Sequence, residues 1–136
     1  MKHVHDIFIS YARQDREFAT DLGDALRGSG NNVWFDATTT GHAANWEDYL
    51  RERIGKCDVF IALMSPASVA NANVMSELGA AIAAGKAVIP VVPTNGRLPP
   101  GLPGPLRKWQ FIRSGKRGAD EIAAEIGERM DKPTTV

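Results

Sequence analysis

Short apolar runs alternate along the chain with longer segments of helical period, and this alternation limits the possible fold more than any other feature. The runs that predict strands are HDIFISY (5–11), NNVWFD (31–36), DVFIALMS (58–65), KAVIPVV (86–92) and, at an edge, WQFI (109–112). Continuous apolar runs of this length are typical of strands that are buried on both faces. Strands that alternate with helices indicate βαβ units, so we expect an α/β fold with a five-stranded parallel sheet and helices on both faces.

The segments between these runs place apolar residues at helical spacing. The predicted helices cover DREFATDLGDALRGSG (15–30), WEDYLRERIGK (46–56), the segment around Glu77 that follows the turn SPASVAN (65–71), and GADEIAAEIGERM (118–130). PTNGRLPPGLPGPL (93–106) is dense in proline and glycine and predicts a loop. We therefore expect one domain over residues 1–130 and a frayed tail over 131–136.

Charge and cysteine content exclude several classes of protein. Among 136 residues, 16 basic and 16 acidic side chains give a net charge of zero, so there is no field of one sign to attract nucleic acid or an anionic membrane. The apolar runs are far shorter than the roughly 18 residues of a membrane span. The single cysteine, Cys57, cannot form an internal disulfide and borders an apolar run, which favours a reduced, buried thiol and a cytoplasmic location.

Several nucleotide-binding and metal-binding motifs are missing. The segment GAAIAAGKA has the wrong glycine spacing for a phosphate-binding loop and ends in alanine, and GSGNNV follows a helix where a dinucleotide fingerprint would follow a strand. The acidic residues of a response-regulator receiver are absent from FISYAR and ALMSP. The histidines His3, His5 and His42 have no metal-like spacing with Cys57, so we expect no metal site and no bound cofactor.

Ligands of parallel sheets gather beyond the carboxyl ends of the strands, at the point where the winding reverses. In this sequence those ends are Ser10 to Arg13, Asp36, Ser65 with Pro66, and Pro93.

The blocks HDIFISYARQD, VWFD, CDVFIALMSPASV and SELGAAIAAGKAVIPVV resemble, in order and spacing, the Toll/interleukin receptor (TIR) domain, particularly its bacterial members. The resemblance covers about residues 5 to 130. It implies a flavodoxin-like strand order and two ways of working. Some members are interaction modules, and others cleave the nicotinamide–ribose bond of NAD to give nicotinamide and ADP-ribose or a cyclic isomer. For a bacterial member it implies cytoplasmic immune signalling, such as antiviral defence, or interference with host TIR signalling.

The resemblance assigns Glu77 as the catalytic glutamate, on the helix after the third strand. Cleavage of this bond passes through an oxocarbenium-like state, which a nearby carboxylate stabilises. Ala80, Ala81 and Ala84 follow at helical spacing, so this flank would either pack closely on the sheet or leave room for a ribose. The alternative is that Glu77 favours the positive end of the helix dipole and points into water.

The resemblance also implies a substrate-binding set, which consists of Tyr11, Ala12, Arg13, Asp36, Trp46 and Ser65. Arg13 would pair with the diphosphate and Tyr11 would stack on a base or on nicotinamide, although Arg13 could equally be a solvated loop charge. Asp36 and Ser65 also suit structural roles at the ends of their strands. Trp46 could instead pack beside its helical neighbours.

Two departures from the family pattern affect the expected site. The segment GHAANW is longer than usual before the aromatic residue, and Asn73 stands where an aromatic residue commonly precedes the catalytic glutamate. The second departure could weaken NAD binding or change the product.

Three functions stay open at this level. The first is an NAD hydrolase or cyclase with Glu77 as its carboxylate. The second is a non-catalytic module that joins other TIR domains, or further copies of itself, through the loop 37–45. The third is a nucleotide-sugar transferase, which would transfer the sugar onto an acceptor base.

Overall fold

The computed structural model describes residues 4–36, 46–93 and 110–131. Its elements are β1 (Asp6–Ser10), the 3-10 helix η1 (Arg13–Asp15), α1 (Arg16–Gly28), β2 (Asn32–Asp36), α2 (Trp46–Lys56), β3 (Val59–Leu63), α3 (Pro66–Val69), α4 (Ala72–Ala83), β4 (Ala87–Val92), β5 (Ile112–Arg113) and α5 (Ala119–Asp131). Within these ranges no helix has the length and apolar character needed to cross a lipid bilayer.

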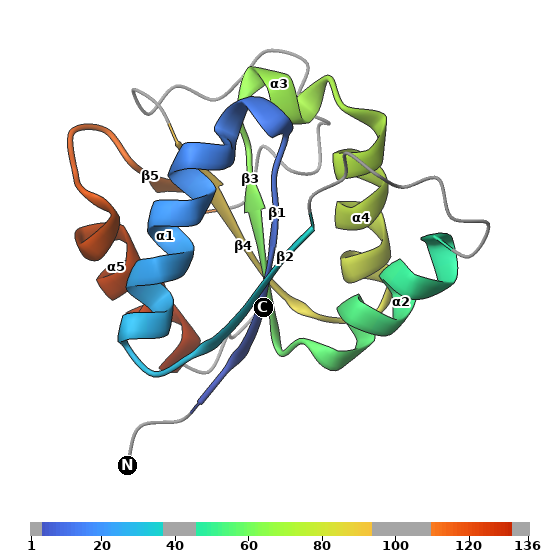
Figure 1. Cartoon of the computed structure of the whole chain (residues 1–136), viewed down its shortest axis with the longest axis horizontal. Helices are drawn as coiled ribbons and strands as arrows, with labels where there is room; N and C mark the ends of the chain where they lie inside the picture. Colours follow the sequence, from blue (N-terminus) through green and yellow to red (C-terminus); the bar gives the residue numbers. More distant parts are fainter. Residues whose placement is uncertain (1–3, 37–45, 94–109, 132–136) are drawn as a thin grey trace.

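The strands form one parallel sheet with the order β2-β1-β3-β4-β5. This is the flavodoxin-like order, and the predicted fold class is confirmed. The chain winds from β1 outward to β2 and then returns to place β3 on the other side of β1, so the winding reverses between β1 and β3 (Figure 1). Both strands are therefore central, and every residue of β3 is buried.

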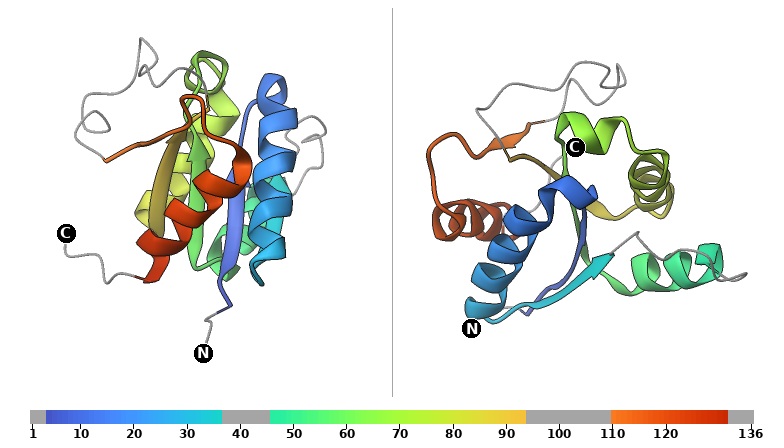
Figure 2. Two further views of the ribbon diagram at one scale, coloured as in Figure 1. Left: turned by 90° about the vertical axis from the view of Figure 1, so that its left-hand side faces the viewer. Right: turned by 45° about the horizontal axis from the view of Figure 1, so that its top comes forward.

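Two helical layers cover the sheet. Helices α1 and α5 lie together on one face, and α2 and α4 lie on the other (Figures 1 and 2). The side chains of β1 alternate between these layers: Ile7 and Ile9 belong to the apolar cluster under α1 and α5, whereas Phe8 belongs to the cluster under α2 and α4. Phe8 stacks on Phe60 of β3, with 5.5 Å between the ring centroids.

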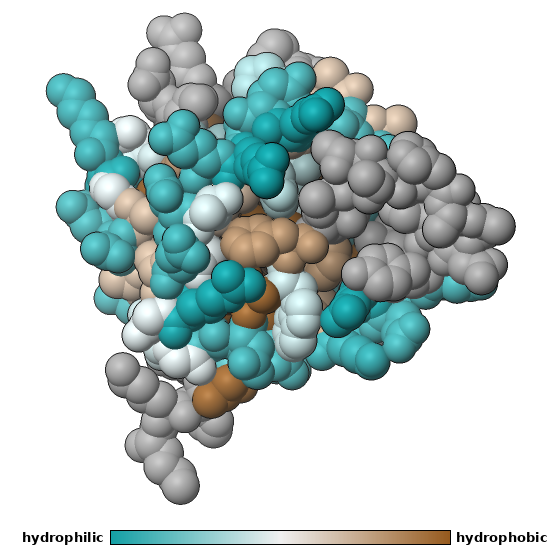
Figure 3. Space-filling view, viewed as in Figure 1, coloured by the Kyte–Doolittle hydropathy of each residue, from teal (hydrophilic) through white to brown (hydrophobic). Residues whose placement is uncertain are grey.

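Helix α1 approaches β2 closely because Gly23 has no side chain. A Cβ at Gly23 would lie 2.2 Å from Cζ of Phe35 on β2, so the ring occupies the space of the missing side chain. Arg27 covers the same ring, with its guanidinium carbon 5.2 Å from the centroid, and donates to the carbonyl of Val33 at 2.8 Å. On the face shown in Figure 3, a few hydrophobic residues come to the surface near the middle of the view, between hydrophilic ones.

The segment 65–71 differs from its predicted form. The sequence predicts a turn, but residues Pro66–Val69 form the short helix α3. Ser65 caps it, since its hydroxyl accepts a hydrogen bond from the backbone N–H of Ser68, and Pro66 suits the first helical position because it needs no donor there.

The fifth strand is shorter than predicted and lies later in the chain. β5 pairs only Ile112 and Arg113, opposite Val91 and Val92. The carbonyl of Val91 accepts from Met64 on the β3 side and that of Val92 accepts from Ser114 on the β5 side, so the nitrogen of Pro90 also faces β5. Proline has no N–H to donate, so the ladder cannot continue past Pro90. At its carboxyl end, β4 stops at Val92, directly before Pro93.

Candidate functional site

The carboxyl ends of β1 and β3 lie side by side at the reversal of the winding. Ser10 ends β1 and pairs in register with Ala62 on β3 and Asp36 on β2. The chain then continues into η1 after β1 and into α3 after β3, and both short helices lie at this edge of the sheet (Figure 1). This is the place where an open parallel sheet holds its ligands.

Helix α4 starts at the same edge and carries Glu77. Its first turn is capped by Asn71, whose side-chain oxygen accepts from the backbone N–H groups of Asn73 and Val74 at 2.9 and 3.2 Å. The helix ends before Gly85, whose φ of +72° suits a glycine after a helix terminus.

Glu77 is buried among the residues that hold α4 on the sheet. Its exposed fraction is 0%, and its neighbours Val74, Leu78 and Ala81 are also buried. The interpretation in which Glu77 points into water is therefore wrong. The reason is that Glu77 lies one residue before Leu78 and three after Val74, on the flank of the helix that meets the protein interior.

The alanines after Glu77 have different positions. Ala81 is fully buried in the cluster of Phe8, Phe60 and Leu78, and Ala80 packs partly against that cluster. Ala84 is exposed at the end of the helix. Of the two expected roles, the small residue at Ala81 serves close packing of α4 on the sheet.

Ser10 is a second buried polar side chain on the α2 and α4 side of the sheet. It alternates with Ile9, so it points to the same face as Phe8, and its exposed fraction is 0%. Within the described parts of the chain its hydroxyl oxygen has no hydrogen-bond partner. A polar group that is buried without a partner costs stability, so native structures contain few of them.

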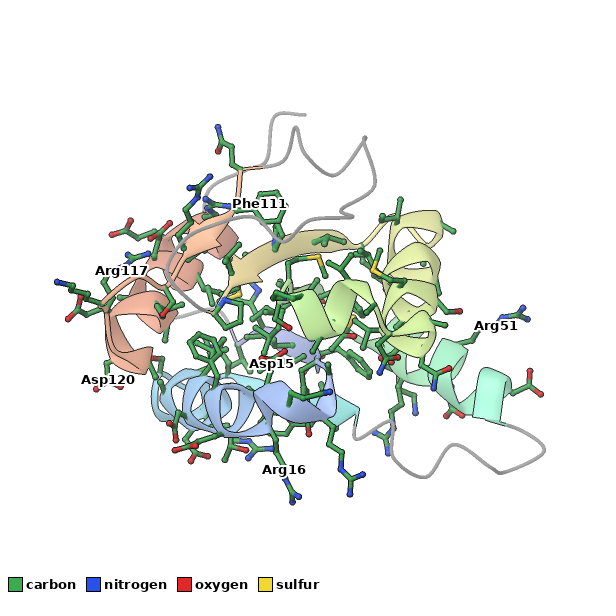
Figure 4. The ribbon with its side chains drawn as sticks, turned by 90° about the horizontal axis from the view of Figure 1, so that it is seen from above. Asp15, Arg16, Arg51, Phe111, Arg117 and Asp120 are labelled. Atoms are coloured by element: carbon green, nitrogen blue, oxygen red, sulfur yellow. The ribbon has the colours of Figure 1, made fainter. Side chains whose placement is uncertain are left out.

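Asp15 connects the two short helices of this edge. Its Oδ2 accepts hydrogen bonds from the hydroxyls of Ser65 and Ser68, the second at 3.3 Å. In Figure 4 Asp15 lies in the middle of the molecule between the start of α1 and α3, whereas Arg16 and Arg51 point away from it. Asp15 is not among the site residues that the sequence predicts. Its signal is an acidic residue five positions beyond the end of β1, at the same edge as the hydroxyls that follow β3.

The residues after β1 have different surroundings from those expected. Tyr11 is buried in the cluster under α1 and α5, and its ring meets that of Phe35 edge-on at 6.2 Å between centroids. Ala12 is buried and its carbonyl accepts from the backbone N–H of Asp15 at 2.8 Å. Arg13 is exposed. Tyr11 thus lies on the face of the sheet opposite Glu77, and the binding roles of these three residues stay predictions.

The other expected site residues are placed only in part. Ser65 is buried and serves as the cap of α3, which fits its structural alternative. Asp36 ends β2 and Trp46 begins α2, while the side chains of both, and the loop 37–45, lie outside the described residues. Asn73 is exposed in the first turn of α4. Their contacts with a substrate stay predictions.

Cys57 lies at the opposite edge of the sheet, just before β3. It is buried, and its thiol donates to the carbonyl of Ile54 at 3.1 Å. Burial raises the pKa of this thiol above its ordinary value of 9.0. A protonated, buried thiol is a poor nucleophile, so Cys57 takes no part in the candidate site.

One hollow among the described residues lies on another part of the molecule. It measures about 570 Å³ between α1 and α5, and its lining includes Asp21, Asp24 and Asp120. It belongs to the face of the sheet opposite Glu77, and carboxylates there would repel the phosphates of a nucleotide.

Comparison with known proteins agrees with this arrangement. A sequence model described as "TIR domain" matches residues 7–127. Among proteins with curated functions, no relative matches the sequence.

Three solved structures show the same fold. The TIR domain of the Toll-related receptor TRR-2 from Hydra magnipapillata has a TM-score of 0.67 and 19% identity, over 93% of this chain and 94% of that one. The CMP N-glycosidase BcmB of Clostridium botulinum has a TM-score of 0.65 and 19% identity, over 91% and 98%. The RPS4 and RRS1 TIR domain heterodimer has a TM-score of 0.61 and 20% identity, over 92% of this chain and 95% of that one.

The likeness of these structures concerns the fold, whereas the family rests on the sequence match over most of the chain. With its parallel sheet in the order β2-β1-β3-β4-β5 and a match over residues 7–127, the chain belongs to the TIR domain family.

Proposed function

We propose that this chain cleaves the bond between nicotinamide and ribose in NAD, with Glu77 as the catalytic carboxylate. The observation that carries the proposal is the complete burial of Glu77 on α4, near the edge where β1 and β3 end. Transfer of a carboxylate out of water is costly, so folded chains keep buried acids mainly where they serve an ion pair or a site. The buried hydroxyl of Ser10 on the same face of the sheet adds a second polar group.

The reaction needs little more than negative charge near the sugar. The bond from the ribose carbon C1′ to the pyridinium nitrogen breaks, its electron pair leaves with nicotinamide, and the positive charge moves onto the ribose. A carboxylate in a low-dielectric environment stabilises this oxocarbenium-like state more strongly than it would in water. Water then attacks C1′ and loses a proton, which gives ADP-ribose; attack by a group of the same molecule gives a cyclic isomer instead.

The complete burial of Glu77 also sets a condition. A substrate can meet this carboxylate only after the groups that cover it have moved, because no part of the side chain is exposed. We therefore infer that the active form differs from this single chain at the carboxyl edge of the sheet. Association with further TIR domains, with the loop 37–45 of one copy beside the site of the next, would supply such a change.

The BcmB structure supports the class of chemistry. That protein is a CMP N-glycosidase with the same fold as this chain, so the fold accommodates cleavage of a nucleotide's glycosidic bond. NAD and CMP share a ribose phosphate whose C1′ carries a ring nitrogen. A panel of NAD, nicotinamide mononucleotide and CMP would distinguish the two bases.

The second candidate is a non-catalytic interaction module. It is favoured by the RPS4 and RRS1 structure, in which two TIR domains form a heterodimer. This candidate requires assembly that ignores Glu77 and responds to substitutions in the loop 37–45.

One experiment separates the candidates. The purified chain is incubated with NAD over a range of protein concentrations, beside the Glu77→Ala variant, and nicotinamide, ADP-ribose and cyclic products are resolved by chromatography. We expect nicotinamide release by the wild type that is lost in Glu77→Ala, while both proteins assemble equally. Assembly without turnover by the wild type at every concentration would support the interaction module.

A further inference from the structure

Asp15, Ser65 and Ser68 form a small hydrogen-bonded group, the Asp15 clasp, between the two central strands. Ser65 and Ser68 are buried and Asp15 is half-buried. Both hydroxyls donate to Oδ2 of Asp15. Because Asp15 closes η1, which follows β1, and Ser65 follows β3, the clasp joins the carboxyl ends of these strands across 50 positions of sequence.

The carboxylate is the group that holds the clasp together. The oxygens of Ser65 and Ser68 also lie 3.2 Å apart, but each hydroxyl has a single proton to donate. A carboxylate accepts more strongly than a hydroxyl, so both protons point to Asp15. The oxygen of Ser65 then remains able to accept from the backbone N–H of Ser68 at 3.1 Å, which caps α3.

A short, hydrogen-bonded path leads from the clasp to the helix of Glu77. The backbone N–H of Asn71 donates to the carbonyl of Ser68 at 3.0 Å, and the side chain of Asn71 caps α4. Helix α3 packs against α4. Hydrogen bonds through only two residues, Ser68 and Asn71, therefore connect Asp15 to the start of α4. Glu77 follows in the second turn of that helix.

We infer that Asp15 is a positioning residue for Glu77. It holds α3, and through α3 the first turns of α4, at one place relative to β1, and so fixes where the carboxylate of Glu77 meets the sugar. Asp15 acts through the clasp and has no contact with the reacting atoms. This inference rests on the proposed cleavage of NAD.

The test compares three variants. Asp15→Ala removes the acceptor, Asp15→Asn keeps an amide oxygen that can accept one or both hydroxyls, and Asp24→Ala removes an exposed carboxylate on α1 as the matched control. For each protein, kcat and KM for nicotinamide release are measured at a temperature well below the midpoint of its thermal unfolding.

We expect kcat of Asp15→Ala to fall by about 10-fold or more with KM changed by less than about threefold, because a small displacement of a catalytic group acts on the transition state. Asp15→Asn should recover part of this loss, and Asp24→Ala should match the wild type. A merely structural role would lower the midpoint of Asp15→Ala but leave kcat of the folded protein within about twofold of the wild type, and that result would overturn the inference.

A second measurement keeps this test separate from that of the proposed function. Hydrogen exchange is followed at the backbone amides of residues 68–75 in the wild type, Asp15→Ala and Asp24→Ala. We expect exchange to be about 10-fold faster or more in Asp15→Ala alone, since the start of α4 loses its anchor. Unchanged exchange there would overturn the inference even if NAD is cleaved, whereas a wild type without turnover contradicts the cleavage and leaves the exchange result to decide on Asp15.

Discussion

At the scale of single residues, the position of Glu77 could be predicted but its surroundings could not. The spacing between the third and fourth predicted strands places a glutamate on the intervening helix, and the structure has it there. A lone acidic residue in an early helical turn favours water, however, and only the packing of Leu78 and Ala81 on the sheet shows that this flank faces the interior. Asp15 was missed because its partners lie 50 and 53 residues away along the chain.

Cys57 gives a test of burial at this scale. Because desolvation raises the pKa of its thiol, this group favours folding at pH values below its ordinary 9.0 and loses that contribution as the pH rises through the raised folded value. We expect the difference in free energy of unfolding between the wild type and Cys57→Ala to shrink above about pH 9. Urea unfolding of both proteins from neutral pH to about pH 10 measures it. A constant difference across this range would contradict the burial of the thiol.

At the scale of elements, the sequence predicts the four longer strands from their continuous apolar runs and the long helices from their helical period. The sequence could not predict the length of β5 or the short helix α3, because both depend on contacts with residues that lie far away along the chain. β5 is confined to Ile112 and Arg113 because Pro90, whose nitrogen faces β5, has no N–H to donate and because β4 ends at Val92. The short helix α3 replaces a predicted turn because the cap at Ser65 and the clasp with Asp15 stabilise a single helical turn.

The contact between α1 and β2 predicts a large effect for a small substitution. Gly23→Ala would place a methyl group 2.2 Å from the ring of Phe35, so the helix or the ring must shift. We expect the free energy of unfolding to fall by about 1–3 kcal/mol. Gly28→Ala on the same helix is the control, because nothing lies within 4 Å of its added Cβ, and it should leave stability unchanged or slightly higher. Equal effects of the two substitutions in urea unfolding would disprove the close approach.

The cap of α4 provides a second test of an element. Asn71→Ala removes the acceptor of two backbone N–H groups in the first turn of this helix. We expect a loss of about 1 kcal/mol in the free energy of unfolding. Asn73→Ala changes an exposed side chain in the same turn and should cost less than half as much. Thermal unfolding followed by circular dichroism distinguishes the two variants, and a larger loss in Asn73→Ala would contradict the assignment of the cap.

At the scale of the whole molecule, the complete burial of Glu77 and the TIR domain heterodimer of RPS4 and RRS1 both favour activity in an assembly over activity of a single chain. The single chain buries the carboxylate to which we assign the proposed reaction, so we expect activity to require a partner that changes the carboxyl edge of the sheet. We expect the rate of nicotinamide release per chain to rise with protein concentration. Initial rates compared with mass measurements by light scattering test this, and a rate per chain that is independent of concentration would show that the single chain opens by itself.

The catalytic role of Glu77 is tested by the initial rate of nicotinamide release from NAD by the wild type, Glu77→Gln and Glu121→Gln at one high protein concentration. Glutamine keeps the size of the buried side chain at position 77 and removes only its charge, while Glu121 is an exposed glutamate in the first turn of α5. We expect Glu77→Gln to be slower than the wild type by about 100-fold or more, and Glu121→Gln to be equal to it. If Glu77→Gln releases nicotinamide at a rate within about threefold of the wild type, or the wild type releases none, the buried carboxylate is not the catalytic group of this chain.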